Sequence, residues 1–157
     1  MGSTSRTIAI GTALSGTLDI LSAFLFGAMA GVLPNRILRY VASGPFGDAM
    51  RDGGLGAALL GLAVHYSIMA VMVTVFVMAA RRLPALLRHP LAAGTAYGIL
   101  LYFVMYWIVV PLRFPANLPK LNVWSLGNAL FSHIVCVGIP MALVTARALH
   151  SRRPAIA

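Results

Sequence analysis

Acidic residues and cysteine are almost missing from this chain. Its 157 residues include three Asp, no Glu and one Cys, and charged residues of all kinds make up 10%. A soluble domain carries about 25% charged residues, so this composition excludes an ordinary water-soluble enzyme, a disordered tail and a coiled coil. A single Cys excludes a disulfide framework and a cysteine-based zinc module. With 60% apolar residues, the chain is expected to be a membrane protein.

The motifs of soluble catalysis are absent as well. The chain has no Gly-x-Ser-x-Gly, Walker loop, His-Glu-x-x-His or Gly-x-Gly-x-x-Gly. The sequence therefore predicts no catalytic residues and disfavours enzymatic activity.

Four apolar stretches are long enough to cross a bilayer as helices. A hydrocarbon core of about 30 Å needs roughly 20 apolar residues, and residues 8–30, 55–80, 91–110 and 123–146 meet this length. They show no alternation with a period of two, which excludes a transmembrane barrel, so backbone groups in lipid must be satisfied within helices. The predicted fold class is all-α: a polytopic membrane protein in which residues 1–157 form a single four-helix transmembrane domain.

The basic residues predict the orientation of these helices. Seven lie on the side that carries both termini: Arg6, Arg81, Arg82, Arg88, Arg147, Arg152 and Arg153. Five lie on the other side: Arg36, Arg39, Arg51, Arg113 and Lys120. The positive-inside rule then places both termini in the cytoplasm. Because the net charge of +9 flanks the spans and forms no stripe with aromatic residues, we expect contact with anionic lipid headgroups and no nucleic-acid partner.

Residues 31–54 form the longest connection between the apolar stretches. Pro34 suits a first helical turn, and Ile37 and Tyr40 follow at helical spacing. A short helix over residues 33–43, lying in the membrane interface, is therefore predicted. Gly44-Pro45-Phe46-Gly47 is expected to turn the chain after it. The segment is either a plug over the outer mouth of the bundle or an anchored connector.

Asp19 lies near the middle of the first apolar stretch. It is eleven residues from the outer end, which at ~1.5 Å per residue is about 16 Å deep. A charge at that depth costs about 2.5 to 3.5 kcal/mol on insertion scales, so Asp19 is expected to face the bundle interior and find partners. Thr12, Ser15, Gly16 and Ser22 share its helical stripe.

Three further polar residues, His65, Tyr102 and His133, fall at a similar depth. Each histidine lies about 15 Å from the outer end of its stretch, and Tyr102 lies nine residues before Pro111. Each of the four helices thus contributes one polar group to a common layer. We predict that Asp19, His65, Tyr102 and His133 bind a ligand or a proton.

Two helix features are predicted to shape this layer. Gly94-x-x-x-Gly98 lets a neighbouring backbone approach closely. Pro140 cannot donate a hydrogen bond to the carbonyl of Cys136, so the helix is expected to bend there and to free that acceptor close to His133.

Three interpretations of the layer remain open. In the first, it binds or passes a small ligand, ion or proton, with Asp19 as the exchangeable carboxyl and His65 and His133 as its partners. In the second, the two histidines hold zinc, copper, non-haem iron or a haem. The default expectation is that the chain binds no cofactor. In the third, the polar groups only hold helices together, and the chain is a non-catalytic membrane scaffold or partner subunit. Transport through so few helices would need a homo-oligomer, for which Gly27-x-x-x-Gly31 is a candidate seam.

Several short strings carry a resemblance to a known group. They are Gly16-Thr17-Leu18-Asp19-Ile20, the segment from Pro34 to Gly44, Gly61-Leu62 with His65, Tyr102-x-x-Met105 with Pro111-Leu112, and His133 with Gly138-x-Pro140. Together they resemble small four-helix bacterial inner-membrane proteins to which no activity is attached. The resemblance spans most of the chain, implies a four-helix fold in the inner membrane, and points to Asp19, His65 and His133. A looser similarity to YagU-type inner-membrane proteins assigns no residue a role.

Overall fold

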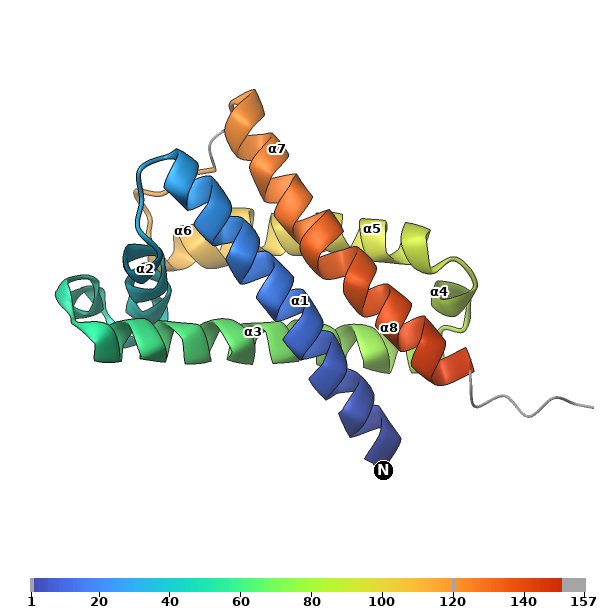
Figure 1. Cartoon of the computed structure of the whole chain (residues 1–157). Coiled ribbons are helices and arrows are strands. Elements are labelled where there is room, and N and C mark those ends of the chain that lie inside the picture. Colours follow the sequence, from blue (N-terminus) through green and yellow to red (C-terminus); the bar gives the residue numbers. More distant parts are fainter. Residues whose placement is uncertain (1, 120, 151–157) are drawn as a thin grey trace, which may run out of the picture.

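The chain folds into four long helical rods and one shorter helix. In the computed structural model, which describes residues 2–119 and 121–150, every regular element is helical (Figure 1). The first two rods are α1 (Gly2–Met29) and α3 (Leu55–Arg82). The third consists of α5 (Pro90–Phe103), η2 (Val104–Val109) and α6 (Val110–Arg113). The fourth consists of α7 (Val123–Phe131), η3 (Ser132–Gly138) and α8 (Ile139–His150). Each rod is long and apolar enough to cross a membrane.

The rods differ from the predicted apolar stretches at their ends. The first begins well before residue 8 and ends at Met29, the third continues to Arg113, and the fourth continues to His150. Apolar length underestimates a helix because polar residues at its ends continue the backbone hydrogen bonding. Lys120, Arg152 and Arg153, which entered the orientation argument, lie outside the described residues.

Small residues bring the third and fourth rods into backbone contact. A Cβ atom added to Gly94 would lie 2.6 Å from the carbonyl oxygen of Gly138, and one added to Gly98 would lie 2.5 Å from that of His133. No side chain fits between the two helices at these points. The predicted close approach at Gly94-x-x-x-Gly98 is therefore confirmed, and the neighbour it admits is η3.

α2 (Pro34–Phe46) lies across the beginning of α3 (Figure 1). Gly61 makes this possible, because any side chain there would collide with the backbone of Leu38. The prediction of a helix over residues 33–43 is correct in kind but too short, and the predicted turn over residues 44–47 is wrong. The helix continues through Pro45 and ends at Gly47, whose φ of +89° favours glycine. The short turn η1 (Asp48–Asp52) then leads to α3.

The third and fourth rods each contain a π-helical segment directly before a proline. In η2 the last hydrogen bond with π-helical spacing runs from the N–H of Val110 to the carbonyl of Met105, five residues back, and Pro111 follows. In η3 the N–H of Ile139 donates to the carbonyl of Ile134, and Pro140 follows. Where the sequence predicted a bend at Pro140, the structure has the π-helical segment Ser132–Gly138 on the N-terminal side of that proline. Such segments insert one residue into a turn and are frequent at functional sites.

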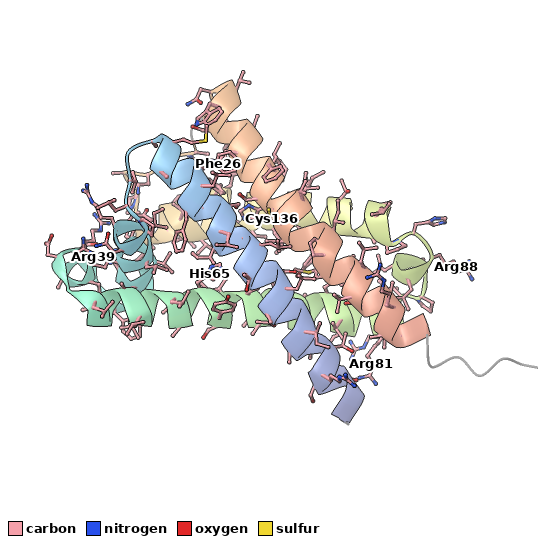
Figure 2. All side chains as sticks on the ribbon, viewed as in Figure 1. Phe26, Arg39, His65, Arg81, Arg88 and Cys136 are labelled. Atoms are coloured by element: carbon pink, nitrogen blue, oxygen red, sulfur yellow. The ribbon has the colours of Figure 1, made fainter. Side chains whose placement is uncertain are left out.

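Large apolar side chains cover the outside of the molecule, and the interior combines an apolar core with several small polar side chains. On α1, Ser15 and Ser22 are buried, whereas the outward stripe is large and apolar: Ile10, Leu14, Leu18, Leu21 and Leu25. Arginines lie at the two ends of the rods, with Arg39 on α2 and Arg81 and Arg88 at the opposite end (Figure 2). The buried apolar core, which includes Val73, Val77 and Met141, lies between α3 and the fourth rod.

Figure 1 also shows α4 (Ala85–Arg88), a single turn that joins α3 to α5. The N-terminal end of α1 lies beside the C-terminal end of α3, where Arg81 donates a hydrogen bond to the hydroxyl of Thr4 over 3.2 Å. This end of the bundle is the one opposite α2.

Candidate functional site

A cavity of about 480 Å³ lies between α1, α2, α3, η2 and η3. Its walls are mostly apolar. Its titratable lining residues are Asp19, Tyr40, His65, Tyr106, Arg113 and His133. Three of the four residues predicted from the sequence therefore line one cavity.

The carboxyl of Asp19 has no hydrogen-bond partner among the described residues. The side chain is 23% exposed, and the only hydrogen bond that Asp19 makes outside the helical backbone pattern in the described residues is through its backbone carbonyl, which accepts from Ser22 Oγ. The nearest charged partner is His65, whose Nδ1 lies 3.9 Å from Asp19 Oδ2. This separation is too long for a hydrogen bond. A protonated His65 ring forms an ion pair with the carboxylate across it, and a neutral ring does not.

His65 is oriented by the backbone of α1. Its Nε2 lies 2.9 Å from the carbonyl oxygen of Gly16. A carbonyl oxygen only accepts hydrogen bonds, so Nε2 carries the hydrogen and donates it. In the neutral ring the lone pair therefore sits on Nδ1, the nitrogen that faces Asp19. Asp19 and His65 thus present two proton-accepting groups to the same space.

His133 is held in the same way by its own helix. Its Nδ1 donates to the carbonyl oxygen of Ala129 over 2.9 Å, and Nε2 has no hydrogen-bond partner among the described residues. The rings of Tyr102 and Tyr106 meet the imidazole edge to face, with centroids 6.3 and 5.7 Å away. In its neutral form, His133 therefore adds a third proton-accepting group to the cavity.

Tyr106, rather than Tyr102, is the tyrosine on the cavity wall. Tyr102 is 4% exposed and does not line the cavity, although its ring stacks on that of Tyr106 with centroids 5.2 Å apart. Counting residues along an ideal helix selected Tyr102 by depth, but the part of the third rod that lines the cavity begins at Met105, on η2. The spacing of four residues between the two tyrosines was the available signal, because it places both rings on one face.

Small hydroxyls fix α1 against η3 on either side of Asp19. The hydroxyls of Ser22 and Ser132 lie 2.7 Å apart, and Ser15 Oγ donates to the carbonyl of Val137 over 3.3 Å. Ser15 and Ser22 belong to the polar stripe recognised in the sequence. They hold the rotation of α1 that turns Asp19 towards the cavity.

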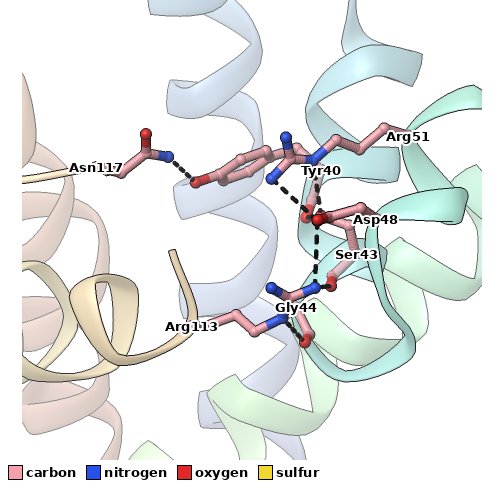
Figure 3. Close-up of polar contacts among 7 residues, drawn as sticks. All are labelled: Tyr40, Ser43, Gly44, Asp48, Arg51, Arg113 and Asn117. Carbon is pink, nitrogen blue, oxygen red and sulfur yellow. Dashed lines mark hydrogen bonds and ion pairs between the residues drawn. The ribbon is translucent and has the colours of Figure 1, made fainter. Parts of the chain in front are cut away.

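Arg113 closes the α2 end of the cavity. Its guanidinium donates to the carbonyl oxygens of Gly44 at 2.7 Å and Ser43 at 2.8 Å, and to the carboxylate of Asp48 at 3.2 Å (Figure 3). These contacts tie the end of α6 to the end of α2. No sequence motif marks Arg113, because its partners are mainly backbone carbonyls that any sequence offers.

Aromatic rings extend this closure. Tyr40 stacks on Phe114 with centroids 4.8 Å apart, and the Arg51 guanidinium lies over both rings. Asn117 donates to the Tyr40 hydroxyl over 2.7 Å (Figure 3). We call this set of eight residues the clasp: Tyr40, Ser43, Gly44, Asp48, Arg51, Arg113, Phe114 and Asn117. α2 and the clasp include the connecting segment that the sequence interpreted as either a plug or an anchored connector.

The geometry of the described residues does not supply a set of metal ligands for the metal interpretation. Within residues 2–119 and 121–150, no group of three or more His, Cys, Asp or Glu side chains is arranged to hold a metal ion. His65 and His133 each use one ring nitrogen for a backbone carbonyl. Cys136, also on η3, is buried.

Comparison of the chain with protein-family models, with curated proteins and with solved structures found no match. The geometry of the cavity therefore carries the functional conclusion.

Proposed function

We propose that this chain is an integral protein of the bacterial inner membrane that binds or passes a small ligand, ion or proton at Asp19. The membrane location is supported by four rods long enough to span and by the large apolar side chains on their outer surface. In this proposal, α2 and the clasp lie on the outer side, and both termini are cytoplasmic.

One observation carries the functional part of the proposal: the Asp19 carboxyl faces a cavity and accepts no hydrogen bond from the described residues. An ionised carboxylate inside a membrane is costly, so a purely structural carboxylate is expected to be satisfied by donors. Asp19 instead has one neighbour at ion-pair distance, His65. A site of this kind is completed by a proton or by a ligand.

The two histidines take different parts in this proposal. His65 is the direct neighbour of Asp19, because its Nδ1 faces the carboxyl at 3.9 Å. His133 lies on another wall of the cavity and offers Nε2 as an acceptor. Asp19 is the residue on which binding depends, and the imidazoles adjust the charge around it.

The experiment that tests the proposal measures whether Asp19 is reachable and exchangeable. Dicyclohexylcarbodiimide is lipophilic and adds to protonated carboxyls in apolar surroundings, and mass spectrometry of peptides locates the adduct. We expect the adduct on Asp19 in membranes containing the protein and none in the Asp19→Asn variant. Asp52→Asn is the matched control, since Asp52 is exposed on η1, and it should leave the adduct unchanged. An unreactive Asp19 in folded protein contradicts the proposal.

A non-catalytic scaffold or partner subunit is the second candidate. It is favoured by the hydrogen bonds that His65 and His133 make to backbone carbonyls, which hold helices in place. Under this function, Asp19→Asn changes only thermal stability. A stoichiometric membrane partner, or a second copy of the chain, is then recovered by affinity purification in mild detergent. The Gly27-x-x-x-Gly31 motif is less accessible to a second copy of the chain than the sequence predicted, because Ile37 of α2 covers Gly27.

A further inference from the structure

The cavity wall between α3 and η2 is partly open to the outside. Ile68 on α3 and Val109 on η2 both line the cavity, yet they are 36% and 42% exposed. Farther along α3, the Tyr97 hydroxyl donates to the carbonyl of Met72 over 2.9 Å and joins the second rod to the third. In the described residues, no hydrogen bond joins the rods at the level of Ile68. The cavity therefore opens sideways between α3 and η2, towards the apolar outer surface.

The α2 end is a poor entrance for a cation. Arg51 and Arg113 share the carboxylate of Asp48 there, and Arg39 donates to the carbonyl of Gly53. The exposed Asp52 on η1 is the second carboxylate at this end, so the arginines still outnumber the carboxylates. A cation approaching from this end meets an excess of positive charge. The side opening at Ile68 presents no charge.

The inner end of the cavity offers acceptors and a negative charge. The Asp19 carboxylate, His65 Nδ1 and His133 Nε2 all accept hydrogen bonds when the rings are neutral. Of the basic residues, Arg113 alone lines the cavity within the described part of the chain, and its guanidinium is bound to α2. The Tyr106 ring forms part of the same wall.

These features select a class of ligand. A neutral hydroxyl would leave the carboxylate charge uncompensated. A bare inorganic cation would lose its hydration shell against walls such as Ile20, Met69 and Val137 that offer no oxygen atoms. An organic cation with an apolar body satisfies both the carboxylate and the walls, and an aromatic ring is a favourable neighbour for it.

We infer that the cavity binds a lipophilic organic cation, a protonated or quaternary amine, which reaches Asp19 from the bilayer through the opening between Ile68 and Val109. The inference rests on the proposed function and specifies its ligand. The cation and a proton on the Asp19–His65 pair compete for the same negative charge. The other titratable groups on the cavity are His133, Tyr106, Tyr40 and Arg113.

The ligand class is tested with a charged and a neutral probe of the same shape. Phenyltrimethylammonium and tert-butylbenzene differ in having a nitrogen cation or a carbon at the centre of the head. In nanodiscs, with empty nanodiscs as the baseline, calorimetry should show saturable binding of the ammonium and at least tenfold weaker binding of the hydrocarbon. Asp19→Asn should weaken ammonium binding at least tenfold, and Asp52→Asn should not change it. Equal affinity for both probes overturns the inference.

The route is tested by narrowing the opening. Ile68→Trp and Val109→Trp should each slow association of the ammonium at least threefold. Val71→Trp is the matched control, because Val71 is exposed on α3 but does not line the cavity, and its association rate should equal that of the unaltered protein. Unchanged rates in both opening variants, with binding intact, overturn the route.

Carbodiimide labelling separates failure of the inference from failure of the proposed function. Saturating phenyltrimethylammonium should protect Asp19 from the adduct. If Asp19 reacts and the ammonium does not protect it, the inferred ligand is wrong, and the proposed function, a reachable and exchangeable carboxyl at Asp19, is retained. If folded protein shows no adduct at all, the proposed function is contradicted and the inference falls with it.

Discussion

At the scale of single residues, the site depends on positions where no side chain exists. Gly94, Gly98 and Gly138 allow the third and fourth rods to meet backbone to backbone, and this contact places His133 beside Tyr106. In lipid, packing of this kind replaces the hydrophobic effect as the force between helices. The glycines therefore position the site although none of them lines the cavity.

Gly98→Ala should destabilise the protein. Its Cβ would lie 2.5 Å from the His133 carbonyl oxygen and 2.7 Å from Ile134 Cα, so the backbones must separate, at a cost of about 1–3 kcal/mol typical of overpacking. Reversible unfolding in mixed micelles measures this loss. Gly127→Ala on α7 is the control, since a Cβ there meets nothing within 4 Å, and it should be neutral or stabilising by up to about 1 kcal/mol. Equal stability of both variants would refute the packing account.

At the scale of elements, the π-helical segments and α2 decide which side chains reach the cavity. η2 carries Tyr106 and η3 carries His133, and each segment precedes a proline whose ring does not fit a regular α-helical turn. α2 covers the cavity from one end and is joined to α6 by Arg113. The π-helical segments η2 and η3 and the helix α2 therefore form separate parts of the cavity wall and together set its shape.

Arg113→Lys should loosen α2 without unfolding the bundle. Lysine has one ammonium and cannot reproduce the forked contacts to Gly44, Ser43 and Asp48. We expect at least tenfold faster hydrogen exchange in α2 and no comparable change in α3, measured by mass spectrometry in nanodiscs. Arg36→Lys is the control, because Arg36 is exposed on α2. Unchanged exchange in Arg113→Lys would show that the clasp does not hold α2.

At the scale of the whole molecule, the two ends of the bundle are chemically different. The end with α2 carries the clasp, and the opposite end carries Arg81 beside the start of α1, Arg82 at the end of α3 and Arg88 on α4. An even number of spans places both described ends of the chain on one side of a membrane. The orientation can therefore be tested by labelling one residue at each end of the bundle, in η1 and in α4.

Cysteine labelling in intact cells should report that orientation. In a Cys136→Ser background, Asp52→Cys should react with a membrane-impermeant maleimide from outside, and Arg88→Cys should react only after lysis, because the positive-inside rule puts Arg88 in the cytoplasm. Unaltered protein is the control, since its single cysteine is buried. The reverse labelling pattern would invert the proposed topology and put the clasp in the cytoplasm.

The sequence by itself determined the four helices, the small polar stripe on α1 and the depths of Asp19, His65 and His133. These are local properties, because the length of an apolar run fixes where a helix lies and residue spacing fixes depth along it. The close approach at Gly98 was also readable, since a missing side chain is itself local information.

Only the tertiary structure decided which groups face the cavity. Rotation of a helix about its axis depends on contacts with its neighbours, and the third rod lines the cavity with Tyr106 instead of Tyr102. The clasp was equally hidden, because Arg113 binds carbonyl oxygens about seventy residues away in the chain. Backbone acceptors have no sequence signature, so the chain had to fold before the closure of the cavity and its side opening became visible.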